Sequence, residues 1–163
     1  MTLVTINPSA SNHDGREASG TMTLTGHVVL TGGLMWAGLI LPSVAVPAGA
    51  TISSAYLYYK SRDTARDDPD LTWYAQAADN AAVLTTTASD ITNRSRTTTS
   101  VSDVATAIGT TNYRQVTITT LIAEVVARGG WASGNNMALI GDCGGGVALE
   151  FSSYDTGSNI WYV

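Results

Sequence analysis

The chain has 163 residues, a formal net charge of −5 and only 13% charged residues. This length is sufficient to bury a stable core, so we predict a single domain over residues 1–163. The weakly acidic composition excludes extended nucleic-acid binding, which needs clustered Lys and Arg, and no apolar run is long enough to cross a membrane as a helix. Cys143 is the only cysteine, which excludes an intrachain disulfide.

The first half of the chain predicts strands, because apolar and polar residues alternate between turn residues. The polar residues 9–20, which include Asp14 and Glu17, are expected to form a loop. The chain start lacks the basic and long apolar segments of a secretory signal peptide, so we do not expect ordinary secretion. The predicted strands of this half cover residues 3–6, 21–25, 27–30, 34–40, 51–59 and 71–77.

The second half predicts one helix, over residues 121–128, because four apolar side chains fall on one stripe. Thr120 is expected to cap its N-terminus, and Gly129 with Gly130 is expected to end it. Glu124 and Arg128 have the i,i+4 spacing of a helical ion pair. The apolar stripe consists of Leu121, Ile122, Val125 and Val126.

Residues 79–112, rich in Thr, Ser and Ala, predict a long loop with small elements, in which Arg94 and Arg96 are solvated. Further strands are predicted at residues 113–118, 137–140, 147–151 and 160–163. About nine short antiparallel strands with one short helix are typical of an all-β, jelly-roll-like β-sandwich.

The residue pattern does not favour catalysis. Cys143 precedes three glycines, and both histidines are far away in sequence, whereas a catalytic thiol needs a neighbouring base. The carboxylates are spread over separate segments, without the facing pair that a hydrolase requires. We therefore predict a protein that is not an enzyme and has no catalytic residues.

Two kinds of binding residue remain as candidates. Asp14, Glu17 and Asp155 could supply hard oxygen ligands from separate loops to a structural Ca²⁺ ion, the one cofactor considered, although no EF-hand spacing is present. The alternative is that these carboxylates are simply solvated.

Aromatic side chains are the second kind, because exposed rings can stack on sugars while buried rings fill a core. Trp36 and Trp73 lie in apolar strands and are predicted to be core residues, whereas Trp131 lies in a turn and fits either role. The expected contacts to a glycan or protein partner are Trp131, Tyr154 and Trp161.

Three segments resemble the DNRLRE (disaggregatase-related) group of β-sandwich modules. They are Val46-Pro-Ala-Gly-Ala-Thr-Ile-Ser-Ser-Ala-Tyr-Leu57, the stretch from Leu121-Ile-Ala-Glu124 through Arg128-Gly-Gly-Trp131 to Leu139-Ile140, and Glu150-Phe-Ser-Ser-Tyr-Asp155. The resemblance implies a jelly roll like those of carbohydrate-binding modules, found in bacterial surface proteins and in phage proteins. It brings no catalytic residues.

From this resemblance and the low charge we expect a phage virion structural protein of the capsid-decoration or head- or tail-associated kind. Such a protein is made in the host cytoplasm, contacts other virion proteins and forms a homo-oligomer. We expect neither nucleic acid nor a membrane as partner. The alternative is a carbohydrate-binding module of a secreted or surface protein, with a glycan as ligand. If residues 160–163 form an edge strand, they could pair with a neighbouring molecule.

Overall fold

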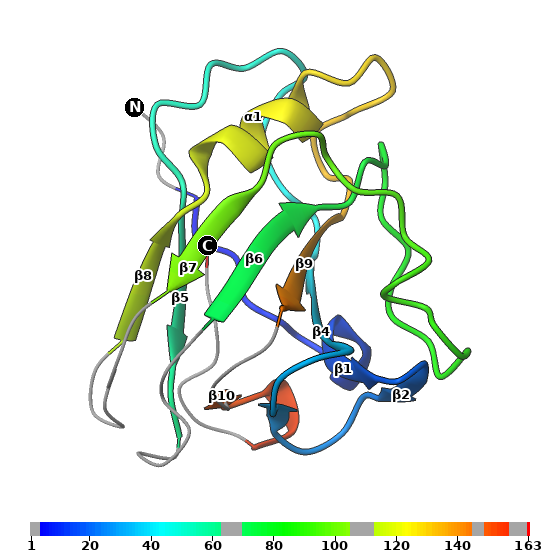
Figure 1. Cartoon of the computed structure of the whole chain (residues 1–163). Coiled ribbons are helices and arrows are strands. Elements are labelled where there is room, and N and C mark those ends of the chain that lie inside the picture. Colours follow the sequence, from blue (N-terminus) through cyan, green and yellow to red (C-terminus); the bar gives the residue numbers. More distant parts are fainter. Residues whose placement is uncertain (1–3, 63–69, 105–112, 145–148, 157–162) are drawn as a thin grey trace.

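The computed structural model describes residues 4–62, 70–104, 113–144, 149–156 and 163. Within these residues the chain forms ten strands in antiparallel sheets and a single short α-helix, so the predicted all-β, jelly-roll-like sandwich is confirmed. Figure 1 shows the sheets as two layers, with helix α1 across one end.

The first layer is a six-stranded antiparallel sheet in the order β2-β1-β4-β9-β6-β7. Strands β4 and β9 form its centre and pair from Met35 opposite Cys143 to Leu41 opposite Met137. Residues on both strands are almost all buried, as expected for strands covered on both faces. The six strands are β1 (Asp14–Ala18), β2 (Thr21–Thr23), β4 (Met35–Leu41), β6 (Asp70–Ala75), β7 (Val101–Val104) and β9 (Met137–Cys143).

The second layer combines two strand pairs, β5 (Tyr56–Lys60) with β8 (Tyr113–Thr117), and β3 (Val28–Leu30) with β10 (Leu149–Phe151). An antiparallel bridge between Ser61 and Phe151 joins the pairs, and the Arg62 N–H donates to the Glu150 carbonyl over 2.9 Å. The second sheet therefore continues from β8 through β5 and β10 to β3.

The main core lies between the layers and contains large aromatic side chains. The Tyr59 ring is 5.6 Å from the Phe151 ring and 6.4 Å from the Trp73 ring, centroid to centroid. All three side chains are fully buried, and the prediction that Trp73 is a core residue is confirmed. Helix α1 (Thr119–Val126) closes one end of this core with the predicted stripe, because its buried residues are Leu121, Ile122, Val125 and Val126.

A buried carboxylate connects the layers at one margin of the core. Asp103 on β7 is 1% exposed and accepts hydrogen bonds from the Tyr59 hydroxyl at 2.6 Å and the Trp73 indole N–H at 3.4 Å. Its other oxygen, Oδ1, accepts a hydrogen bond from Nε of Arg114 at 2.8 Å and forms an ion pair with Nη2 of the same residue, also at 2.8 Å. Because Asp103 and Trp73 belong to the first sheet and Tyr59 and Arg114 to the second, this cluster bonds the sheets to each other.

A second, smaller core lies on the outer face of the six-stranded sheet, under residues 76–98. Leu84 and Ile91 of this segment pack there on Ile40 and Ile140. A Cβ atom at Gly38 would lie 2.9 Å from the Ile91 side chain, so the glycine permits this close approach. The predicted loop is therefore a packed cover of the sheet, stabilised by its own apolar residues.

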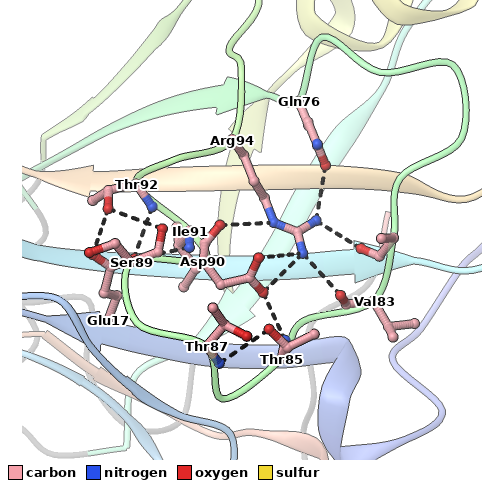
Figure 2. A network of polar contacts seen from close by, with 11 residues as sticks. Glu17, Gln76, Val83, Thr85, Thr87, Ser89, Asp90, Ile91, Thr92 and Arg94 are labelled. Atoms are coloured by element: carbon pink, nitrogen blue, oxygen red, sulfur yellow. Dashed lines mark hydrogen bonds and ion pairs between the residues drawn. The ribbon is translucent and has the colours of Figure 1, made fainter.

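The expectation that Arg94 and Arg96 are solvated is wrong. Arg94 is 9% exposed, and its guanidinium donates to Gln76, to the Ala82 and Val83 carbonyls and to Asp90, as Figure 2 shows. The Arg96 guanidinium lies 4.2 Å from the centroid of the Trp36 ring and 5.5 Å from that of Tyr74. Sequence composition could not reveal these partners, because most are backbone carbonyls and rings from distant strands.

The predicted polar contacts of the helix are also wrong. The residue before α1 is Ile118, which makes no side-chain cap, and the Thr119 hydroxyl instead accepts the Ala55 N–H at 3.0 Å. Glu124 does not pair with Arg128, whose Nε donates to Asp79 at 2.6 Å. The Glu124 carboxylate instead accepts four hydrogen bonds, from the backbone N–H and hydroxyl groups of Thr98 and Thr99, at 2.6–3.0 Å.

Two strands were missed, β1 within the expected loop 9–20 and β7 within 79–112. The polar composition of β1 concealed it, because the pattern gave no sign that its two carboxylates, Asp14 and Glu17, are buried. The predicted strand at 3–6 is not assigned in its described residues 4–6, and the predicted strand at 160–163 lies outside the described residues except for Val163. Their last members, Ile6 and Val163, exchange two backbone hydrogen bonds, at 2.8 and 3.1 Å, so these two residues already pair within the chain.

We predict that Asp103→Asn lowers the free energy of unfolding by about 2–4 kcal/mol, because the buried Arg114 contact and the two aromatic donors lose their anionic acceptor. Urea unfolding at neutral pH measures this difference. Ser102→Ala, one residue earlier on the exposed face of β7, serves as the control and should stay within about 0.5 kcal/mol. An equally small effect of Asp103→Asn would contradict the role given to the carboxylate.

A second prediction concerns the pH dependence of stability. Desolvation raises the pKa of Glu124, but the hydrogen bonds from Thr99 and Thr98 outweigh it and lower the pKa from 4.5 to about 2. A depressed folded-state pKa stabilises the protein above pH 4.5, and this contribution disappears as the pH falls toward 2. Glu124→Gln should therefore cost about 1 kcal/mol at pH 7, after allowance for solvent screening, and almost nothing at pH 2. Urea unfolding at several pH values tests this, and a pH-independent difference would refute it.

Candidate functional site

Asp14, one of the predicted cation ligands, is at the start of β1 and has no exposed surface. Its Oδ2 atom accepts the Tyr154 N–H at 2.7 Å, whereas Oδ1 has no hydrogen-bond partner within the described residues. Burial raises the pKa of Asp14 from 3.8 to about 7; the Tyr154 hydrogen bond opposes the shift and the charge of Asp155 adds to it. The environment of Asp14 thus disfavours the charged form of its carboxyl group.

Asp155 lies near Asp14, although 141 positions later in the sequence. It belongs to the 3₁₀ turn η3 (Tyr154–Thr156), which packs against the 3₁₀ turn η1 (Ser11–His13) just before β1. The Ser11 hydroxyl donates to Asp155 Oδ1 at 2.6 Å. Ser153, directly before η3, is 1% exposed and its hydroxyl has no partner in the described structure. The two turns therefore bring two predicted carboxylates and two serines together.

Glu17, the third predicted cation ligand, is already fully used by the protein. Its Oε2 accepts the backbone N–H groups of Ile91 and Thr92 at 3.0 and 2.9 Å, and its Oε1 accepts the Thr92 hydroxyl at 2.7 Å, as Figure 2 shows. Glu17 is 1% exposed. Its role is to anchor the segment 76–98 on the sheet, so the structure separates it from Asp14 and Asp155.

No group of three or more His, Cys, Asp or Glu side chains that could hold a metal occurs among the described residues. A cation near Asp14 would consequently depend on the two aspartates, on hydroxyl or carbonyl oxygens and on water. Sequence reasoning missed Ser11 and Ser153, because isolated serines in polar segments carry no recognisable pattern.

The predicted aromatic contacts do not form one surface. Trp131 is 3% exposed, and its indole N–H donates to the Val46 carbonyl at 2.9 Å, so its ring offers no face to a sugar. Tyr154 is 39% exposed on η3, while Trp161 lies outside the described residues. The turn around Trp131 folds inward because the indole packs in the main core.

A cavity of about 790 Å³ lies elsewhere, between the N-terminal segment, residues 44–58 and the end of the main core. Apolar residues such as Val46, Ile52 and Met137 line it, and none of its described lining residues is charged. Its hydroxyl groups come from Thr5, Thr51, Ser53, Ser54, Tyr56 and Tyr58.

Strand alternation places the two tyrosines in this cavity wall. Leu57 and Tyr59 of β5 point into the core, and Tyr56 and Tyr58 therefore lie on the opposite face, with ring centroids 6.2 Å apart. The sequence alone could not indicate that residues 44–55 curve back to make a cavity beside β5.

A further exposed feature lies where β7 and β8 end their sheets. Each has one hydrogen-bonded neighbouring strand among the described residues, β6 for β7 and β5 for β8. The Asp103–Arg114 ion pair holds the two strands close, and the adjacent residues Val104 and Tyr113 are 64% and 41% exposed. Figure 1 shows β7 and β8 on the same side of the sandwich.

Comparison with known proteins provides no relative on which to base a function, because no protein-family model and no curated protein matches the chain. The resemblance to DNRLRE modules therefore stays a prediction. No helix in the described part of the chain is long and apolar enough to cross a membrane.

Proposed function

We propose that the chain is a non-catalytic structural protein of a phage virion, a capsid-decoration or head- or tail-associated protein that assembles through its β-sandwich. The observation that supports assembly is the pair of sheet edges β7 and β8, which lie together and carry the exposed side chains of Val104 and Tyr113.

Sheet edges of this kind favour association, because an edge strand presents backbone N–H and C=O groups that a neighbouring strand can pair with. Two large apolar side chains at the edges add surface that is stabilised by burial against another molecule. Copies of one chain that meet through such a patch form symmetric oligomers, the arrangement expected of a protein on a repeating lattice.

The virion location is supported by the sequence. Charged residues are only 13% of the chain, with Thr, Ser, Asn and Gly forming much of the polar remainder, and three segments resemble modules found in phage proteins. On this proposal the protein is made in the host cytoplasm and its partners are virion proteins and further copies of itself.

Light scattering on the purified chain tests the assembly part of the proposal. We expect a discrete oligomer for the natural sequence and a shift to monomer for the double variant Val104→Lys/Tyr113→Lys, because two charges cannot be buried unpaired in the contact. Leu34→Lys is the matched control, since Leu34 is 75% exposed on a different part of the surface. A monomeric natural chain, or an oligomer that the double variant leaves intact, would refute assembly through these edges.

The second candidate function is carbohydrate binding, favoured by the cavity beside β5. A neutral sugar suits it, because the cavity combines apolar walls, two tyrosine side chains and several hydroxyls without a charge. Tyrosine rings can stack on the apolar faces of a sugar while hydroxyl groups hydrogen-bond to its rim.

A glycan array followed by calorimetry on the best ligand tests this candidate. Tyr58→Ala should weaken binding by about tenfold or more if the ring stacks on the sugar, since one stacking contact contributes about 1–2 kcal/mol. Tyr154→Ala leaves the cavity intact and should bind like the natural chain. Loss of binding in Tyr154→Ala alone would place the sugar at the surface predicted from the sequence, and no binding on the array would exclude the candidate for the glycans tested.

A further inference from the structure

The environment of Asp14 contains two buried oxygen atoms that have no partner among the described residues. They are Oδ1 of Asp14, a residue with no exposed surface, and the hydroxyl oxygen of Ser153, a residue that is 1% exposed. The two residues lie close together, because Asp14 Oδ2 accepts a hydrogen bond from the N–H of Tyr154, the residue that follows Ser153. Buried polar atoms without partners are rare, and an unseen ion or water is one of the standard explanations.

A second carboxylate, that of Asp155, lies close to Asp14 on the exposed turn η3. Asp155 is held by the Ser11 hydroxyl through one oxygen, and its negative charge contributes to raising the pKa of Asp14. Two like charges in a partly dry environment repel each other, and a cation between them removes that repulsion.

Protonation of Asp14 alone satisfies the geometry less well. It would neutralise the carboxyl group, but it would leave the negative charge of Asp155 unbalanced and the Ser153 hydroxyl still without a partner among the described residues. A cation that reached both oxygens would give each of them a partner and would balance the charge of Asp155.

We propose that a divalent cation of the oxygen-preferring class, with Ca²⁺ as the probe, binds between β1 and η3 through Asp14, Asp155 and the Ser153 hydroxyl. Carboxylate and hydroxyl oxygens with water completing the shell suit Ca²⁺, which accepts six to eight oxygen ligands in flexible geometry.

The bound cation would link residues near the two ends of the chain. Asp14 begins β1 in the six-stranded sheet, whereas Ser153 and Asp155 follow β10 of the other sheet. Binding should therefore stabilise the folded chain as a whole, because a ligand that binds only the folded state shifts the unfolding equilibrium.

The experiment uses the full chain, freed of metal by chelation and dialysis, at pH 7.5 and constant ionic strength. Calorimetric titration with CaCl₂ should show one site, and saturating Ca²⁺ should raise the melting temperature by about 5 °C or more. Asp155→Asn, at an exposed side chain that does not threaten folding, should weaken Ca²⁺ binding at least tenfold. Ser153→Ala should weaken it less, and Asp70→Asn, an exposed carboxylate on β6, is the matched control and should bind normally.

The variant Asp14→Asn provides an independent test of the cation site. It removes a buried charge and should raise the melting temperature of the metal-free chain while abolishing the response to Ca²⁺. Two outcomes would overturn the proposal. The first is that the natural chain shows neither heat nor a thermal shift at a 100-fold excess of CaCl₂ over protein. The second is that Asp155→Asn responds to Ca²⁺ as the natural chain does. Light scattering on the same samples keeps the tests separate, because a natural chain that forms the expected oligomer but shows no Ca²⁺ response refutes the cation site and leaves the assembly proposal standing.

Discussion

The buried Asp103 carboxylate is the interaction on which the arrangement of the two sheets depends. A charge without solvent exposure is stable only when donors surround it, and here the donors come from three other strands. Tyr59 and Trp73 must therefore lie in a fixed register, and their rings in turn pack on the aromatic core. The same contact draws the ends of both sheets together, so the two open edges face one side of the molecule.

Two further carboxylates are buried in the first sheet, and comparison among the three distinguishes structure from function. Asp103 and Glu17 have each found a full set of protein donors, so each acts as a structural anchor. Asp14 is equally buried, but one of its oxygens has no partner in the described part of the chain, and the charge of Asp155 lies close by. For Asp103 and Glu17, donors of the protein itself offset the cost of burying a charge. For Asp14, we propose that a bound cation does so.

The proposed binding surfaces occupy separate parts of one rigid framework. Strands β7 and β8 supply the assembly edges, residues 44–58 and β5 supply the neutral cavity, and β1 with η3 supplies the cation site. Each is made from segments that follow a strand or end a sheet, which is where a sandwich leaves polar groups and side chains available to partners. Assembly, glycan binding and cation binding can therefore be altered by different substitutions.

The sequence by itself determined the fold class and the helix stripe, because alternation with period two and spacing of three to four residues are local consequences of backbone geometry. It identified Asp14 and Asp155 as candidates but grouped Glu17 with them and expected Trp131 at a surface. Only the tertiary structure decided that Glu17 anchors a distant segment, that Arg94 is buried on backbone carbonyls, and that β1 is a strand rather than a loop. Whether a polar side chain is solvated or buried depends on partners far away in sequence, and local pattern contains no information about those partners.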